Sequence, residues 1–106
     1  MDFNEVYSEI SRINKKDPAT HEARLGKLFE ESGELAKAIN KTNGRKVLGE
    51  GENSDSIRDE IVYEAADTIQ NVISIIDGFG ITSKELLQAM SDKNMHWENK
   101  VDKKDI

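Results

Sequence analysis

Cysteine is absent from the 106 residues of this sequence. The chain therefore has no disulfide framework, no thiolate nucleophile and no zinc site built on thiolates. A protein without cysteine fits a reducing compartment, and we expect a cytoplasmic location.

Long apolar runs and basic stretches are also lacking. The longest uncharged stretch of the central segment, Thr68 to Ile76, is too short to span a bilayer. The N-terminus, Met1 to Glu5, has neither a basic region nor an apolar run, so we expect no secretion signal. The formal net charge of −6 and the pI near 4.9 disfavour nucleic-acid backbones and anionic membranes as partners.

Strand-like alternation is missing as well, and the apolar residues follow helical spacing. The sequence predicts an all-α fold in one domain, 1–106, because the chain is long enough for only a modest core. We expect a flexible loop at about 42–55, where glycine and charge are mixed, and a frayed tail at about 101–106. The predicted helices run from about 3 to 16, 21 to 41, 56 to 78 or 80, and 82 to 100.

Capping residues mark where these helices begin. Asp2 and Thr82 are each followed by a glutamate three residues later, as in a capping box. Thr20 is expected to cap the second helix, and Ser56 to open the third. In the last helix we expect core contacts from Leu86, Leu87 and Met90.

The segment from Asp59 to Ile76 predicts a helix that is apolar nearly all round and belongs in a core. Glu60, Glu64, Asp67 and Asn71 fall within roughly 60° of one another on it. Buried carboxylates must be paired, protonated or bound to a cation, so we expect positive charge beside them. Because this helix has more apolar surface than three partners can cover, we also expect a homodimer or homotetramer.

A second pair of acids matches the first. Glu31 and Glu34 are neighbours on one face of the 21–41 helix, three residues apart, as are Glu64 and Asp67 on the central helix. Antiparallel packing of the two helices would bring all four carboxylates together. Oxygen ligands alone suit Mg²⁺ or Mn²⁺, and such an ion favours phosphate chemistry.

At these acids the sequence resembles the MazG-like, all-α nucleoside triphosphate pyrophosphohydrolases. Their signature EExxE matches Glu30 to Glu34, and the later ExxD matches Glu64 to Asp67; the likeness covers about 27–97. The resemblance implies a four-helix bundle completed by oligomerisation. It also implies Mg²⁺-dependent hydrolysis of a (d)NTP to the (d)NMP and pyrophosphate.

The resemblance further implies roles for single residues. Magnesium would be bound by Glu31, Glu34, Glu64 and Asp67. The catalytic glutamates would be Glu30, Glu31 and Glu34, with Glu30 in a supporting role. Substrate contacts are assigned to Lys27, Asn71, Lys93, Asn94 and Trp97. Four of these five also have a plainer interpretation: the two lysines are usually solvated, Asn71 would serve a polar network equally well, and an aromatic residue such as Trp97 usually packs in a core.

Three other functions are compatible with at least part of this pattern. A related enzyme acting on dUTP or phosphoribosyl-ATP would use the same chemistry. A non-catalytic helical interaction module with a vestigial metal site belongs to a different class. A di-iron carboxylate bundle is set aside, because neither His21 nor His96 completes a Glu-x-x-His pair.

Overall fold

The computed structural model describes residues 1–44 and 48–104, with only the backbone of residue 104. All regular structure in these residues is helical, and no strand occurs among them, so the all-α prediction is confirmed. The helices are α1 (Phe3–Asn14), α2 (His21–Thr42), α3 (Ser54–Gly78) and α4 (Ser83–Lys104). Part of the loop predicted at about 42–55, residues 45–47, lies outside the described residues.

The predicted caps of three helices are confirmed. The Asp2 carboxylate accepts from the Glu5 N–H at 2.9 Å, and the Thr20 hydroxyl accepts from the Ala23 N–H at 3.1 Å. At the start of α4, the Glu85 N–H donates to the Thr82 hydroxyl at 3.2 Å, while the Glu85 carboxylate accepts from the Thr82 N–H at 3.3 Å.

The start of α3 differs from the prediction. The helix begins at Ser54, because Asn53 caps it by accepting from the N–H groups of Asp55 and Ser56, each at 3.0 Å. Ser56 completes that cap, since its hydroxyl accepts from the Asn53 N–H at 2.9 Å. The helix ends at Gly78, as predicted, and Gly80 follows with a φ of 76° that favours glycine.

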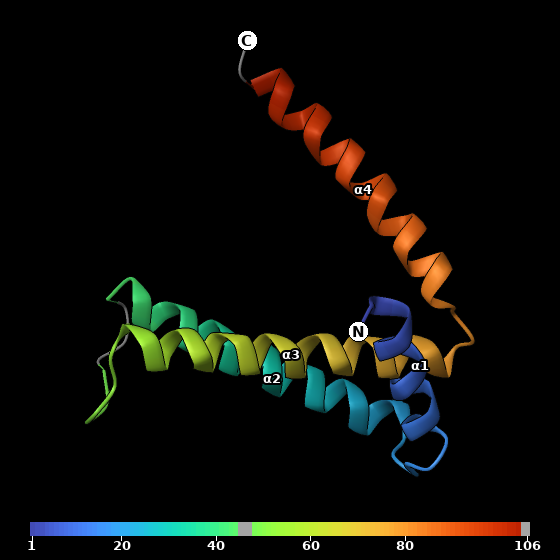
Figure 1. The fold of residues 1–106 in the computed structure, drawn as a ribbon, viewed down its shortest axis with the longest axis horizontal. Coiled ribbons are helices and arrows are strands. Elements are labelled where there is room, and N and C mark those ends of the chain that lie inside the picture. Colours follow the sequence, from blue (N-terminus) through green and yellow to red (C-terminus); the bar gives the residue numbers. More distant parts are fainter. Residues whose placement is uncertain (45–47, 105–106) are drawn as a thin grey trace.

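Helices α2 and α3 pair side by side in antiparallel directions, and α1 crosses the C-terminal half of α3 (Figure 1). The core at this crossing consists of Tyr7 and Ile10 from α1 and Ile73 from α3. Asn14 fixes the crossing, because its amide donates to the Ser74 carbonyl at 2.9 Å and to Asp77 at 3.0 Å. The Tyr7 hydroxyl donates to the Ile81 carbonyl, which ties down the turn before α4.

Helix α4 projects away from the other three (Figure 1), and within residues 1–44 and 48–104 α1 is the one helix against which it packs. Leu86 reaches the core, as predicted, but Leu87 and Met90 are 39% and 50% exposed. Those two predicted core contacts are therefore wrong within one chain, because the helix leaves the core after its first turn. Residues 101–104, where the sequence predicts a frayed tail, continue α4, and residues 105–106 lie outside the described residues.

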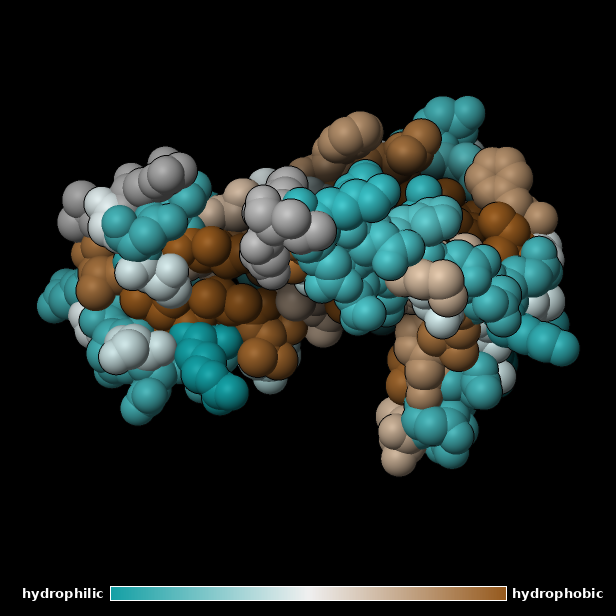
Figure 2. Space-filling view, turned by 90° about the horizontal axis from the view of Figure 1, so that it is seen from above, coloured by the Kyte–Doolittle hydropathy of each residue, from teal (hydrophilic) through white to brown (hydrophobic). Residues whose placement is uncertain are grey.

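The central helix is only partly covered within one chain. Ile57 and Ile73 are buried, whereas Val62 and Ile69 are 59% and 55% exposed. Figure 2 shows apolar surface open over the α2–α3 pair, on the side towards which α4 projects. This exposure agrees with the expectation that partners within one chain cannot cover the helix, since α2 and α1 cover only part of its circumference. Among the described residues, no helix combines the length and apolar character needed to cross a membrane.

Candidate metal centre

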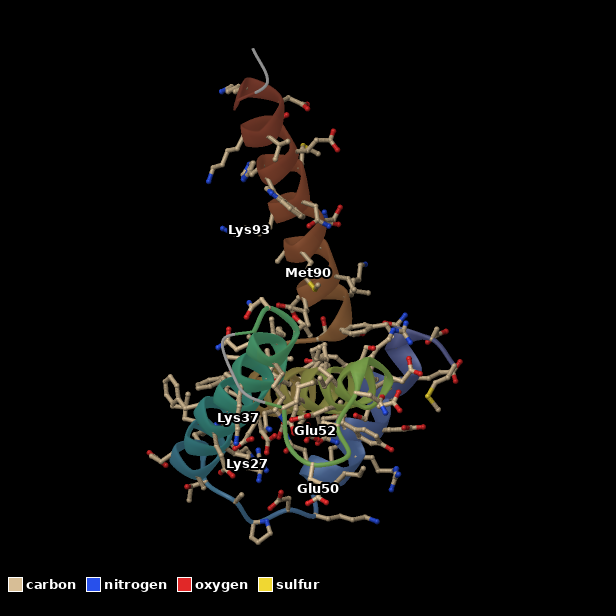
Figure 3. All side chains as sticks on the ribbon, turned by 90° about the vertical axis from the view of Figure 1, so that its left-hand side faces the viewer. Lys27, Lys37, Glu50, Glu52, Met90 and Lys93 are labelled. Carbon is tan, nitrogen blue, oxygen red and sulfur yellow. The ribbon has the colours of Figure 1, made fainter. Side chains whose placement is uncertain are left out.

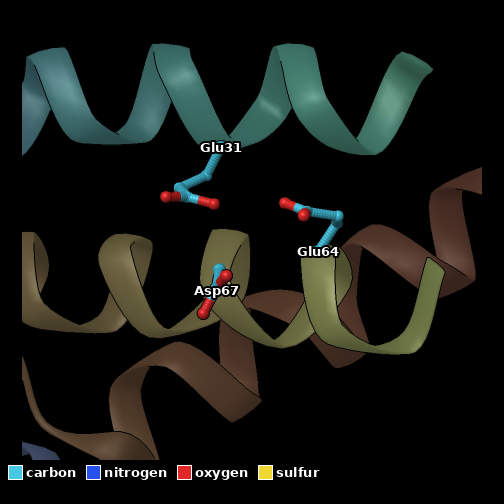
Figure 4. A group of neighbouring side chains, drawn as sticks. All are labelled: Glu31, Glu64 and Asp67. Carbon is cyan, nitrogen blue, oxygen red and sulfur yellow. The ribbon is translucent and has the colours of Figure 1, made fainter. Parts of the chain in front are cut away.

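Three acidic side chains converge between α2 and α3. Glu31 of α2 points toward Glu64 of α3, and Asp67 lies on the next turn of α3 (Figure 4). One carboxylate oxygen from each lies within 4.8 Å of the other two. The antiparallel pairing of the helices produces this group, which we call the acidic centre.

The acidic centre is partly buried, and its charge is not fully compensated. Glu31 is buried, at 7% exposure, and the Oε2 atom of Glu64 is buried without a hydrogen-bond partner in the described part of the chain. Burial raises the pKa of Glu64 above its ordinary value, and the neighbouring Glu31 and Asp67 carboxylates raise it further. A carboxylate in this setting favours either a proton or a cation.

One lysine lies at the edge of the acidic centre. Lys27 is one turn before Glu31 on α2, and its Nζ atom lies 3.2 Å from Glu31 Oε1. The hydrogen bond to Glu31 raises the pKa of Lys27, so the lysine stays charged. Its side chain is 54% exposed and forms no ion pair with Glu64. Lys27 therefore offsets charge at Glu31 and leaves the buried Oε2 atom of Glu64 without a partner among the described residues.

The sequence of residues 3–94 matches the family model described as phosphoribosyl-ATP pyrophosphohydrolase. The chain belongs to this family. A similar protein is the uncharacterized protein YvdC of Bacillus subtilis (strain 168), which is 33% identical over 72 residues, covering 66% of this chain and 68% of YvdC. No solved structure gave a significant match.

Membership confirms the resemblance, because the phosphoribosyl-ATP pyrophosphohydrolase family lies within the MazG-like all-α superfamily. The chain is accordingly a pyrophosphohydrolase, a hydrolase acting on acid anhydrides. Enzymes of the family generally use a divalent metal. This assignment disfavours the alternative of a non-catalytic helical interaction module.

The acidic centre fits a divalent cation of the hard type. Its donors are carboxylate oxygens alone, which Mg²⁺ and Mn²⁺ prefer over the nitrogen and sulfur ligands typical of zinc sites. The buried Oε2 atom of Glu64 supplies an independent reason, since a polar atom without a partner is costly to bury. A cation would satisfy that atom and offset the mutual repulsion of the three acids.

Two further glutamates of the first motif lie beside the centre. Glu34 is exposed, and although its charge helps raise the pKa of Glu64, it does not join the group of three oxygens. Glu30 has a side chain 63% exposed, with its Oε1 atom 4.0 Å from Lys27 Nζ. The metal role of Glu34 and the catalytic roles of both residues remain predictions.

The substrate residues predicted from sequence fall into two sets. Lys27 and Asn71 border the centre; the Asn71 amide donates to the Asp67 carbonyl at 2.9 Å. Lys93, Asn94 and Trp97 are exposed on α4. Figure 3 shows Lys93 standing well apart from Lys27, so a single chain does not bring the two sets together.

Sequence reasoning overlooked the partner of Glu60. Lys41, near the end of α2, has its Nζ atom 3.1 Å from Glu60 Oε2 and 2.8 Å from Glu52 Oε2. The expected positive charge beside the acids of α3 is thus supplied at Glu60. A lysine close to the end of the preceding helix was the available signal, because antiparallel pairing places it opposite the start of α3.

Proposed function

We propose that this chain is a Mg²⁺-dependent nucleoside triphosphate pyrophosphohydrolase that releases a nucleoside monophosphate and pyrophosphate. The observation that carries the proposal is the acidic centre, with three carboxylate oxygens within 4.8 Å and a buried Glu64 oxygen that lacks a partner among the residues the structure describes. A solvated acidic face would leave each oxygen to water, whereas this centre is built into a helix interface.

In the proposed reaction, Glu31, Glu64 and Asp67 hold the divalent cation. When bound, such a cation polarises phosphoryl oxygens and offsets the charge that develops on the leaving pyrophosphate. A glutamate of the first motif, Glu30, Glu31 or Glu34, accepts the proton of the attacking water. The water oxygen forms a bond to phosphorus as the bond between that phosphorus and the pyrophosphate oxygen breaks.

Phosphoribosyl-ATP is the second candidate substrate. The observation that favours it is the description of the family whose model matches residues 3–94. The same acidic centre would serve, because the bond broken is again a phosphoanhydride and the products again include pyrophosphate. A dUTP-specific enzyme would also use this chemistry, through a narrower choice of base.

A substrate panel tests the proposal. The chain is incubated with Mg²⁺ and each of the common ribo- and deoxyribonucleoside triphosphates, or with phosphoribosyl-ATP, and pyrophosphate and orthophosphate are measured separately. We expect pyrophosphate as the inorganic product. Release of orthophosphate with a nucleoside diphosphate would contradict the proposed reaction even if Mg²⁺ were required. Hydrolysis of phosphoribosyl-ATP alone would favour the second candidate.

A homodimer or homotetramer is part of the proposal. Its support is the apolar surface left open in one chain, on α3 at Val62 and Ile69 and on α4 at Met90, Met95 and Trp97, each at least half exposed. Light scattering at micromolar concentration should give at least twice the mass of the chain. A monodisperse monomer would contradict the assembly. The cytoplasmic location expected from the sequence remains a prediction.

A further inference from the structure

A cavity of about 390 Å³ lies between α1, the first half of α2 and the middle of α3. Its volume falls within the range of roughly 300–1,000 Å³ that is usual for small-molecule sites. Part of its wall is apolar, formed by Ile10 and Ile13 of α1 and by Ala19 and Ala23 around the start of α2. Ile13 is 51% exposed, so this apolar wall is open to a ligand.

The cavity adjoins the acidic centre through two of its lining residues. Lys27 lines the cavity and also lies 3.2 Å from Glu31 Oε1. Asn71 lines it from α3 and donates to the Asp67 carbonyl at 2.9 Å. A molecule whose phosphates lie at the acidic centre would therefore extend its next part, past Lys27, into this cavity.

Two carboxamide side chains that line the cavity, those of Asn14 and Gln70, differ in how far they are engaged. The amide of Asn14 is fully engaged, because it donates to the Ser74 carbonyl and to Asp77, and its oxygen accepts from the Ser74 hydroxyl. That network holds α1 against α3 and keeps the wall rigid. Gln70, in contrast, is exposed, and its side chain makes no hydrogen bond in the described part of the chain. Its carboxamide offers one acceptor and two donor hydrogens to a ligand.

We propose that this cavity binds the nucleobase of the substrate, with Gln70 forming hydrogen bonds to the edge of the base. A nucleobase matches the site, since its flat faces suit the apolar wall of Ile13 and Ala23, and its edge carries both donors and acceptors. This inference rests on the proposed function, because the orientation of the nucleotide follows from placing its phosphates at the acidic centre. It assigns base preference to a residue outside both acidic motifs.

Filling the cavity tests its occupant. Ala23 is exposed, so Ala23→Leu should fold and reduce the space open to a base. We expect KM for the preferred nucleoside triphosphate to rise at least tenfold with kcat changed less than threefold, because binding to the non-reacting part of the substrate is lost. The rise in Tm caused by Mg²⁺ without nucleotide should stay unchanged. Ser8→Leu, at an exposed position in a different surface hollow beside α1, is the matched control and should leave KM unchanged.

Replacing Gln70 tests whether its side chain determines the preference for a base. Gln70→Leu keeps a similar volume and removes both hydrogen-bonding groups, so the ratio of kcat/KM between the best and second-best bases should fall at least fivefold. Lys27→Gln, in contrast, should lower kcat/KM by about the same factor for every base, because a contact to phosphate does not distinguish one base from another. An unchanged ratio in Gln70→Leu would overturn the assignment of Gln70.

Direct binding separates this inference from the proposed function. Binding of a nucleoside monophosphate, such as AMP or CMP, is measured by calorimetry with and without Mg²⁺ for the parent chain and for Ala23→Leu. If no triphosphate is hydrolysed but Ala23→Leu still weakens monophosphate binding at least tenfold, the cavity assignment stands and the reaction is wrong. If hydrolysis occurs with an unchanged KM in Ala23→Leu, the cavity assignment is wrong. A change of oligomeric state in that variant, with KM unchanged, would show that the cavity lies at an interface between copies.

Discussion

Two acidic groups lie between the same pair of helices, and they are treated in opposite ways. At the loop end of the pair, Lys41 bridges Glu52 and Glu60, and its side chain is only 11% exposed. One helical turn further along α3, Glu64 faces Glu31, with a buried oxygen that has no hydrogen-bond partner in the described ranges 1–44 and 48–104. Acids that serve the fold are supplied with a lysine, whereas the acidic centre leaves a place for a cation from solution.

Two of the three lysines of α2, Lys27 and Lys41, show the same contrast. Lys41 has nearly all of its side chain covered and contacts two carboxylates, whereas Lys27 is 54% exposed and lies at the rim of the acidic centre. An exposed ion pair contributes little to stability, and its lysine is free to exchange partners. We infer that Lys41 supports the fold and that Lys27 is available to a substrate phosphate.

The largest expected effect comes from neutralising acids of the centre. Glu64→Gln or Asp67→Asn removes one charge at nearly constant volume, and hydrolysis should fall more than about 100-fold, beyond the loss typical of residues that only support metal ligands. The metal-free variants should melt at the same temperature as the parent chain or higher, because mutual repulsion is relieved. Glu60→Gln, one turn away on α3, is the control and should keep activity within a few-fold. Equal losses at Glu60 and Glu64 would remove the distinction between the two groups.

Added Mg²⁺ should stabilise the parent chain through the acidic centre alone. At about 100 times its dissociation constant the gain is roughly 2.7 kcal/mol, equivalent to a rise of order ten degrees in Tm for a domain of this size. Calorimetry or circular dichroism measures the shift. Glu64→Gln should lose most of the rise, whereas Lys41→Met should retain it. A parent chain whose Tm ignored Mg²⁺ up to tens of millimolar, with and without nucleotide, would count against the metal centre.

Replacing Lys41 should mainly lower Tm, whereas replacing Lys27 should mainly raise KM. Lys41→Met leaves Glu52 and Glu60 without their cation, so Tm should fall by roughly a few degrees while kcat/KM stays within a few-fold. Lys27→Met should have the reverse profile, with little change in Tm and a higher KM for the nucleotide. A larger loss of stability from Lys27→Met than from Lys41→Met would contradict the roles inferred from their burial.

Much of the fold follows from the sequence, because capping and helical spacing are local. Thr20 and the Thr82 capping box were found in this way, and the error at the start of α3 arose because Asn53 competes with Ser56 as the cap. The course of α4 was not predictable, since its apolar residues do not say whether their partners lie in the same chain. Met90, expected in the core, is half exposed for this reason.

The acidic centre was partly predictable for the same physical reason. Acids three residues apart on one helix are neighbours, so Glu64 and Asp67 were paired correctly, and antiparallel packing brought Glu31 to them. Which acid of the first motif points inward depends on the rotation of α2, and that is set by packing along its whole length. The sequence therefore did not separate buried Glu31 from exposed Glu34.

The smallest expected effect is on the pH dependence of the metal-free chain, where the two acidic groups should act with opposite sign. The pKa of Glu64 is raised, so the folded chain holds that proton more tightly than the unfolded chain does. Stability should therefore increase as pH falls from neutral through the raised pKa of Glu64, and this gain is complete below the ordinary value of about 4.3. Ionisation of Glu64 near neutral pH removes this gain in stability, and only a bound cation would compensate for it.

The pKa of Glu52 is lowered, chiefly by its hydrogen bond to Lys41. Its contribution is present above about pH 4.3 and should be lost as pH falls through the lowered pKa. Melting curves in EDTA between pH 7 and 3, taken as differences between each variant and the parent chain, isolate the two contributions from the other carboxylates. The difference curve for Glu64→Gln should change above about pH 4.3, and that for Lys41→Met below it. A Glu64→Gln curve parallel to the parent over the upper range would mean that Glu64 ionises as freely in the folded chain as in the unfolded one, and the contrast between the two groups would then rest on geometry alone.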